Sequence, residues 1–477
     1  MRRGGGGKAR GTKPAGANVL GKVHAAQDSA ATAPAQNPGF APLCSPATAP
    51  DDPAPPACEV GAQKLARRSG DPRPMYRISP FVRHFALALL GGAGIATLWV
   101  NLSPGSYYDF VEWHMAELSL PGWIWAGTVT LTPFMVVTDI LMALFFFFIG
   151  KELWEALILE RGALSGGRAL LPAGLVVSGM IGAALMWIVL SALIETAEEA
   201  GFATGWQVPL GSDVVLAYLF GRLAFGPGHP ALHLLLLLAI GTDILALLVL
   251  GLSSPHLSFR LLWLVLPVAA SGAVWALYGR RPPPGTSELR RRAGMALWPY
   301  MLAGAASWFG VAASGLPATL GLLPVIPAIA HADRSFGLFA EAETFLHDPL
   351  NRLAHLLIRP VAVVLFLFGL VRGGVDLLAF APTTLVTLGS LWVGRPLGMA
   401  LGALGLALVF GLRLPPQVRL RHLGLILVIL GCGFTVPAIA LAAALPGGAM
   451  QEAARMGLAL SLLAGPLALL LARSGGR

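Results

Sequence analysis

The chain has 477 residues, of which 56% are hydrophobic and only 12% are charged, about half the charged share of ordinary soluble domains. Many stretches reach the roughly 20 apolar residues that cross a bilayer, so the composition predicts an all-α polytopic membrane protein in a lipid bilayer. A β-barrel is excluded because ten-residue alternating strands do not appear. The net charge of +9 follows the placement of basic residues in loops, so we expect no nucleic-acid partner.

The first 75 residues differ sharply from the rest. Residues 1–75 are rich in Gly, Ala and Pro and contain almost no aromatic or β-branched side chains. Such a segment cannot bury enough apolar surface to fold, so we expect a disordered, dispensable cytoplasmic tail, with Met75 as an alternative start of the chain. Residues 76–477 then form the transmembrane domain.

Twelve hydrophobic segments follow the tail, and each is expected to form a membrane helix. The segments near 206–224 and 316–331 are short or polar at one end, so eleven and thirteen spans are alternatives to twelve. The twelve are residues 83–102, 132–157, 169–194, 206–224, 231–252, 259–279, 295–313, 316–331, 353–372, 382–410, 419–444 and 453–473.

Charges in the connecting loops indicate the orientation. If the N-terminus is inside, Arg-rich loops fall on the cytoplasmic side, which is the positive-inside pattern. An even number of spans, with both termini cytoplasmic, fits this pattern throughout. The cytoplasmic basic residues include Arg161, Arg168, Arg222, Arg280, Arg281, Arg334, Arg413, Arg419 and Arg421, and the opposite loops carry Asp109, Glu112, Glu117, Glu195, Glu198 and Glu199.

The segment that starts at Val208 opens with helix-breaking residues and an acid. Pro209 and Gly211 precede Ser212 and Asp213, so the helix should be interrupted here. Asp213 is placed to offset the partial positive charge of a half-helix N-terminus. On its own, a Pro or Gly in a membrane helix can simply be a kink for packing.

A second acid lies in the next segment. Asp243 is the one charged residue in the apolar run 234–250, where a carboxylate costs roughly 2.5–3.5 kcal/mol even on the mildest scale. A residue of that cost is retained when something is bound or carried there. Thr242 precedes it, and its hydroxyl adds an oxygen of the kind that hard cations prefer. The two acids in adjacent segments therefore predict a cation pathway.

Two further elements lie far downstream. Arg395 falls inside the apolar stretch 382–410, where a buried cation is usually the partner of buried acids. Alternatively, Arg395 extends to the inner interface, or a short loop splits the stretch. Gly431, Gly433 and Thr435 interrupt another segment, and paired interruptions in two halves favour an inverted-repeat transporter with a site at mid-membrane.

These residues together resemble the NhaA-type sodium/proton antiporter family, from about Phe81 to the C-terminus. Each block of the resemblance is weak alone, but five blocks occur in the order of the family. They are residues 139–152 (DILMALFFFFIGKE), 205–213 (GWQVPLGSD), 314–320 (SGLPATL), 393–398 (VGRPLG) and 431–435 (GCGFT).

The resemblance implies a bacterial inner-membrane exchanger of Na⁺ or Li⁺ for H⁺ that regulates intracellular pH and sodium. It implies about twelve helices with inverted-topology repeats, two of them interrupted and crossing near the ion site, and no cofactor beyond the transported ions. Na⁺ is expected at Asp243 and Asp213. The family also forms homodimers through the segment after its first helix, here about 103–131, which diverges from the family pattern.

Three positions depart from the family. An aspartate pair is expected where this chain has Thr242-Asp243, a lysine where it has Arg395, and a pH-linked histidine where it has Pro317. Arginine stays protonated at any relevant pH, whereas a buried lysine can titrate. We therefore expect a lower charge stoichiometry than in relatives, with electroneutral exchange as the limit.

Glu152 matches a family acid near the cytoplasmic entrance and is a candidate for attracting cations there. Its proximity to Lys151 and Glu155 also fits ordinary charge pairs at a cytoplasmic helix end. Two alternative functions stay open: a cation-coupled solute symporter of similar architecture, and a diverged paralogue whose Thr242 and Arg395 impair Na⁺ transport. A third alternative, an intramembrane aspartyl hydrolase, is disfavoured because it gives Arg395 no role.

Overall fold

The computed structural model of the chain describes residues 81–119, 128–158, 169–194, 202–227, 229–253, 260–280, 294–331, 338–339, 348–412, 415, 418–445 and 447–474. Two compact units, Met1–Arg68 and Ser69–Arg477, divide the chain, and every described residue belongs to the second. The predicted tail, residues 1–75, therefore lies outside the described residues.

Eight helical segments in the described part are long and apolar enough to cross a membrane, and each lies within four residues of a predicted segment. Two of them contain a π-helical stretch in the middle, η2 (Val136–Leu141) and η11 (Ser390–Gly394). The eight are Phe81–Leu102 (α2), Pro133–Ile158 (α4 Pro133–Met135, η2 and α5 Met142–Ile158), Leu170–Ile194 (α6), Pro230–Leu252 (α8), Leu261–Gly279 (η6 Leu261–Leu264, α9 Val265–Val274 and η7 Trp275–Gly279), Pro349–Arg372 (α12), Pro382–Phe410 (α13 Pro382–Gly389, η11 and α14 Arg395–Phe410) and Ala449–Ser474 (α17 Ala449–Ser461 and α18 Ala464–Ser474).

The other four predicted segments are broken or short. The 3₁₀ helix η4 (Phe202–Leu210) and α7 (Val214–Phe225) form a pair bent by 51° that makes a ninth span if counted as one. Helix α11 (Trp298–Ser314) has 17 residues, and 316–331 contains the short 3₁₀ helices η8 (Ala318–Leu320) and η9 (Leu323–Ala328). Helices α15 (Leu420–Ile429) and α16 (Thr435–Ala444) share the last segment. The count of twelve and the inverted repeats stay predictions.

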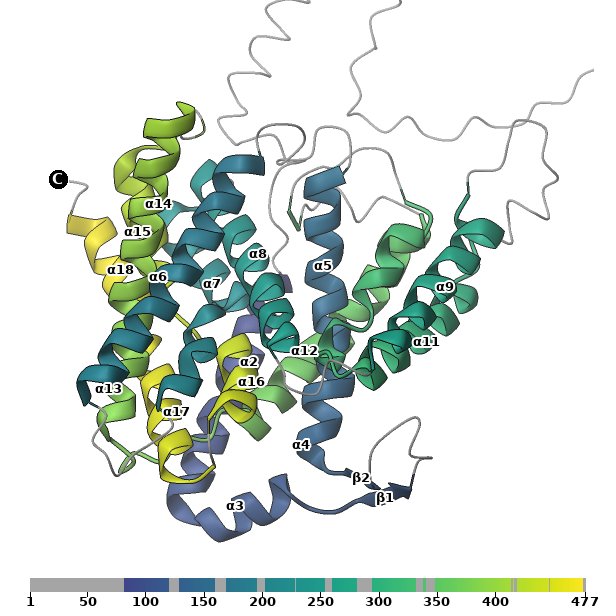
Figure 1. Ribbon diagram of the computed structural model, residues 1–477, viewed down its shortest axis with the longest axis horizontal. Helices are drawn as coiled ribbons and strands as arrows, with labels where there is room; N and C mark the ends of the chain where they lie inside the picture. Colours follow the sequence, from purple (N-terminus) through teal and green to yellow (C-terminus); the bar gives the residue numbers. More distant parts are fainter. Residues whose placement is uncertain are drawn as a thin grey trace, which may run out of the picture. The chain divides into compact units, whose positions relative to one another are not determined.

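The segment at 103–131, expected only as a divergent connection, has structure of its own. It contains α3 (Pro104–Val111) and an antiparallel pair of strands, β1 (Ala116–Ser119) and β2 (Thr128–Leu131), in which Ala116 is opposite Leu131. The described chain is therefore mostly helical with one small hairpin rather than purely helical, and Figure 1 shows this hairpin beyond the end of α4.

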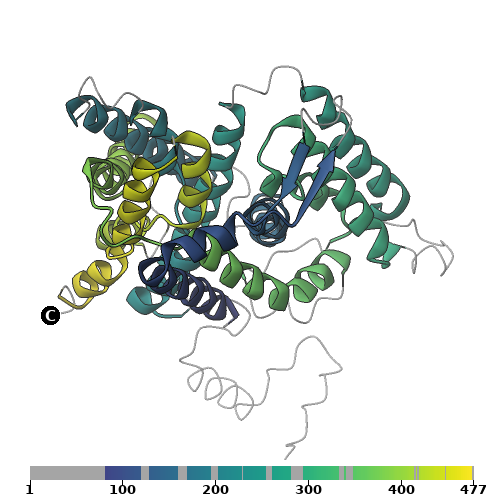
Figure 2. The same cartoon turned by 90° about the horizontal axis from the view of Figure 1, so that it is seen from below.

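Glycines bring two pairs of helices into close contact. Helix α2 packs along α12, and a Cβ on Gly92 would lie 2.0 Å from the carbonyl oxygen of Phe366. Helix α6 packs along α14 in the same way, since a Cβ on Gly182 would lie 2.6 Å from Cα of Gly398. Small residues of this kind let membrane helices approach and gain dispersion contacts that lipid cannot supply. Helices α9 and α11 pack together on the other side of α5 from α6 and α14 (Figures 1 and 2).

The contact between α2 and α12 is open to a matched test. In Gly92→Ala the added methyl group has no room against Phe366, so the helices must separate, and we expect a loss of about 1–3 kcal/mol in the free energy of unfolding. The neighbouring Gly91→Ala is the control, because a Cβ there meets no atom within 4 Å. Thermal unfolding of the purified protein in detergent compares them, and equal stabilities would contradict the assigned contact.

Candidate functional site

The first interrupted helix breaks at the predicted position. Helix η4 contains Pro209 and ends at Leu210, and α7 begins at Val214 after a short non-helical stretch. Asp213 is the N-cap residue of α7, and its Oδ1 accepts a hydrogen bond of 2.8 Å from the backbone N–H of Leu216. An acid at this position satisfies an otherwise unpaired N–H and offsets the positive end of the helix.

The second interrupted helix meets the first. Helix α15 ends at Ile429, and α16 begins at Thr435, whose backbone N–H donates to Asp213 Oδ2 at 3.1 Å. The two breaks are in tight contact, since a Cβ on Gly211 would lie 2.4 Å from Cγ1 of Val436. One carboxylate, that of Asp213, therefore binds the N-termini of two helices that are more than 200 residues apart in sequence.

Arg395 lies at the same crossing and is fully buried, with 0% of its surface exposed. Its Nη1 donates to the carbonyl oxygen of Leu430 at 2.7 Å, and its Nη2 donates to the carbonyl oxygens of Pro209 and Gly211. The two alternatives, an arginine extending to the interface and a loop that splits the stretch, are wrong. Arg395 forms no ion pair with a described acid, so its partners are carbonyls rather than the expected carboxylates.

The charges of Asp213 and Arg395 therefore have complementary positions. Asp213 lies at the N-termini of α7 and α16, where half-helix ends carry about half a positive charge. Arg395 lies where η4 and α15 end, at the corresponding negative ends. Together the two side chains provide partners for backbone groups at four helix ends that would otherwise be unpaired in an apolar interior.

Asp243 reaches this crossing from α8. Its Oδ1 accepts two hydrogen bonds from Ser212, at 2.7 Å from the backbone N–H and at 2.8 Å from the hydroxyl group. Its Oδ2 is buried and has no hydrogen-bond partner among the described residues. The hydroxyl of Thr242 donates to the carbonyl of Leu238 at 2.7 Å within the same helix, so it is already engaged.

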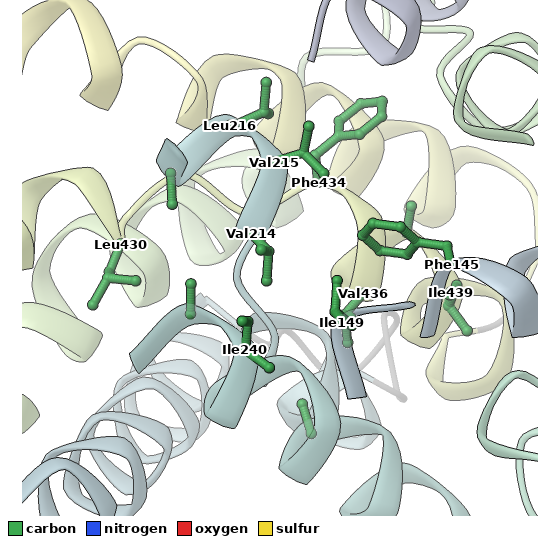
Figure 3. Packing of buried hydrophobic residues seen from close by; sticks show 14 of the residues in the cluster. Phe145, Ile149, Val214, Val215, Leu216, Ile240, Leu430, Phe434, Val436 and Ile439 are labelled. Atoms are coloured by element: carbon green, nitrogen blue, oxygen red, sulfur yellow. The ribbon is translucent and has the colours of Figure 1, made fainter. Parts of the chain in front are cut away.

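The surroundings of these polar groups are apolar. Figure 3 shows the buried side chains that pack about the break, from α5, α7, α8 and the second interrupted helix. Water is largely excluded from such packing, so each charge there has a strong effect on its neighbours. The labelled side chains are Phe145, Ile149, Val214, Val215, Leu216, Ile240, Leu430, Phe434, Val436 and Ile439.

A buried serine on α17, Ser461, also holds the second break in position, and the sequence alone does not predict this role. The backbone N–H of Gly433 donates to Oγ of Ser461 on α17 at 3.1 Å, and both residues are buried. A serine in an apolar segment gives no sequence signal for such a role. Thr435, by contrast, was predicted at the break, and its Oγ1 is buried without a partner among the described residues. At Gly431 a Cβ would lie 3.0 Å from the carbonyl of Val428, so this close approach also favours glycine.

Glu152 lies in a separate buried cluster on α5. The Nζ of Lys151 is 3.2 Å from Oε1 of Glu152 and 3.1 Å from Oε2 of Glu155, and all three side chains are at most 6% exposed. Oε2 of Glu152 also accepts a hydrogen bond of 2.5 Å from the backbone N–H of Phe339. The charge pairs expected at this helix end are therefore present. A role for Glu152 in attracting cations stays a prediction.

Comparison with known proteins identifies the family of this chain. Residues 83–471 match the model of the family described as Na⁺/H⁺ antiporter 1. The chain belongs to this antiporter family. A curated relative, the Na(+)/H(+) antiporter NhaA of Jannaschia sp. (strain CCS1), is 40% identical over 80% of this chain and 94% of its own length. The antiporters named NhaA of Geotalea uraniireducens and NhaA 2 of Pelobacter propionicus are 32% and 30% identical, each over 82% of this chain and at least 95% of their own lengths.

Membership of the antiporter family and the apolar helices together make the chain a multi-pass membrane protein, a transporter rather than an enzyme. The five sequence blocks that carried the resemblance all fall inside or next to the matched region. Thr242 and Arg395, two of the three positions expected to depart from the family, both lie at the crossing of the interrupted helices.

The double role of Asp213 predicts an unusual loss of stability. Asp213→Ala leaves the N–H groups of Leu216 and Thr435 without partners in an apolar interior, so we expect the free energy of unfolding to fall by about 2–4 kcal/mol. Asp348→Ala is the matched control, because Asp348 is the N-cap of α12 alone and is partly exposed. Thermal unfolding in detergent measures both, and a loss no larger than that of Asp348→Ala would refute the double role.

Proposed function

We propose that the chain exchanges Na⁺ or Li⁺ for H⁺, with Asp243 as the shared site for the cation and the proton. The observation that carries this proposal is Asp243 Oδ2, a fully buried carboxylate oxygen with no hydrogen-bond partner among the described residues, at the crossing of two interrupted helices. Such an oxygen can be covered either by a proton or by a hard cation, which prefers oxygen ligands. The antiporters that the chain resembles are named for this exchange.

The remaining groups at the crossing have fixed tasks. Ser212 holds Oδ1 of Asp243 through two hydrogen bonds, so the direction of Oδ2 is set. Asp213 uses one oxygen for each of two helix N-termini, and the engaged oxygens still contribute negative potential to a bound cation. Because Asp243 holds either the proton or the cation, the loss of one is coupled to the gain of the other.

This arrangement supports exchange of one cation for one proton. Thr242 has no ionisable proton in the relevant pH range, and its hydroxyl is bound to Leu238. Arg395 is held by three carbonyls and stays charged throughout the cycle. A single titrating carboxylate therefore moves no net charge when one Na⁺ replaces one H⁺.

The cellular setting is part of the same proposal. We place the chain in a bacterial inner membrane with both termini in the cytoplasm, where this exchange lowers intracellular sodium and regulates intracellular pH. Dimerisation through the segment that contains α3 and the β1–β2 hairpin also belongs to the proposal. A cation-coupled solute symporter would need an organic solute for cation movement, so exchange in its absence separates the two functions.

Asp243→Asn tests the assigned site. The amide cannot take up a proton or carry a negative charge, so exchange should fall to the background rate. Proton movement after addition of NaCl or LiCl to inside-out vesicles, with no organic solute present, measures it. Asp109→Asn on the exposed surface of α3 is the control and should keep the wild-type rate. Unchanged exchange in Asp243→Asn would exclude this site.

The stoichiometry is tested by membrane potential in proteoliposomes. We expect the rate and endpoint of wild-type exchange to be independent of an imposed K⁺ diffusion potential. Thr242→Asp adds a second acid beside Asp243 and should make exchange respond to the potential, whereas Thr242→Ser keeps the hydroxyl and should not. A wild-type protein whose exchange follows the potential would refute the electroneutral proposal.

A further inference from the structure

A second polar site lies away from the crossing. A cavity of about 210 Å³ lies between α3, the C-terminal end of α12 and helices α16 and α17. Its wall includes Tyr108, Glu112, Arg372, Ala442 and Arg455. The loop charges place α3 and Glu112 on the extracytoplasmic side, so the cavity faces that side of the membrane.

Arg372 is the buried cation of this cavity. It lies in the last turn of α12 and is 5% exposed. Its Nε donates to Oγ1 of Thr138 on η2 at 3.3 Å, and its guanidinium carbon lies 3.7 Å from the centre of the Phe134 ring. Among the described residues, its two terminal nitrogens donate no hydrogen bond and form no ion pair. The fork of the guanidinium group is therefore available on the cavity wall.

The other charges that line the cavity form no ion pair with Arg372 among the described residues, and Asp139 on η2, outside the lining, offsets its charge only in part. Arg455 forms an ion pair with Glu452, with Nη1 2.8 and 3.1 Å from its two carboxylate oxygens. Burial and the nearby Glu452 carboxylate raise the pKa of Tyr108 to about 12, so its hydroxyl stays protonated. Glu112 is exposed and is therefore on the solvent side of the cavity wall. The cavity thus has an acid on its solvent side and an unpaired arginine at its buried wall.

Helix α16 connects this cavity to the ion site. Its first residue, Thr435, donates its backbone N–H to Asp213, and Ala442 lies two turns further along the same helix in the cavity wall. Two turns correspond to about 10 Å at 1.5 Å per residue. A cation that approaches Asp213 and Asp243 from this side would therefore pass within the field of Arg372.

We propose that this cavity is the extracytoplasmic end of the cation path, and that Arg372 sets the apparent affinity for the cation on that side by opposing its entry. The proposal rests on the exchange function proposed above. Glu112 has the opposite effect, because an acid on the solvent side raises the local cation concentration. Arg372 is buried, whereas Glu112 is exposed and screened by solvent, so the effect of Arg372 on the affinity is the larger of the two.

A purely structural role of Arg372 makes different predictions. A cation at a helix C-terminus and over an aromatic ring stabilises the protein, and its loss would lower the maximal rate or the yield without favouring one face. An electrostatic effect on entry instead changes the KM for Na⁺ on one face. The dependence of the KM on the membrane face therefore separates the two roles.

The kinetic test compares the two faces of the membrane. In Arg372→Gln, the KM for Na⁺ on the extracytoplasmic face, measured in right-side-out vesicles, should fall on the order of fivefold, as expected for a unit charge at about 10–15 Å. The KM on the cytoplasmic face, measured in inside-out vesicles, should not change. Glu112→Gln should raise the extracytoplasmic KM, and Arg372→Lys should keep it. Arg359→Gln, on the exposed face of the same helix, is the matched control.

Equal changes of KM on both faces, or a fall in the rate alone, would overturn the proposal. If Arg372→Gln does not fold, Glu112→Gln decides, because Glu112 is exposed and its removal should leave the fold intact. In that case an unchanged extracytoplasmic KM in Glu112→Gln would overturn the proposal.

Labelling tests the path without transport. In Ala442→Cys, a membrane-impermeant thiol reagent added to right-side-out vesicles should react with the new cysteine, and addition of the reagent to inside-out vesicles should not label it. The test variant and the control without Ala442→Cys both carry Cys44→Ser and Cys58→Ser, and the remaining Cys432 is buried. Failure of labelling from the extracytoplasmic side overturns the proposed path. If labelling succeeds but the wild-type protein shows no Na⁺/H⁺ exchange, the proposed function fails and the assignment of the cavity to that face stands.

Discussion

The crossing of two interrupted helices leaves backbone groups unpaired in an interior that has little water, and the fold depends on how these groups are satisfied. Asp213 accepts from the N-termini of α7 and α16, and Arg395 donates to carbonyls where η4 and α15 end. Both carboxylate oxygens of Asp213 are therefore engaged, and the guanidinium group of Arg395 is held by backbone carbonyls. Asp243 is different, because one of its oxygens is held by Ser212 and the other is left open.

Much of this architecture could be predicted from the sequence. Eight spans were predicted within four residues, because long apolar stretches bounded by charge have few alternative structures. The cost of a charge in an apolar run predicts Asp243, and the helix-breaking Pro209 and Gly211 predict the first break with Asp213 beside it. The span expected at 316–331 is instead two short 3₁₀ helices, where prolines at 324 and 327 prevent a continuous helix.

The sequence does not reveal contacts between distant segments. A buried arginine was expected to pair with acids, yet the nearest acceptors of Arg395 are carbonyls at positions 35 to 186 residues away. Arg372, in the last turn of α12, gives no sequence signal for a site. Its role at a cavity depends on Thr138 and Phe134, which only the packing of α12 against η2 and α4 brings near.

The position of Arg395 also has a consequence for biogenesis. Helix α14 enters the membrane with a permanent cation at its N-terminal end, at a cost of roughly 2.5–3.5 kcal/mol on the insertion scale. One of its acceptors, the carbonyl of Leu430, is synthesised 35 residues later, and Thr435, the second N-terminus bound by Asp213, follows. Until those residues are inserted, neither charge has its full set of partners. The candidate ion site is therefore completed late in synthesis, and truncation before α15 would leave Arg395 without the Leu430 carbonyl and Asp213 without the Thr435 N–H.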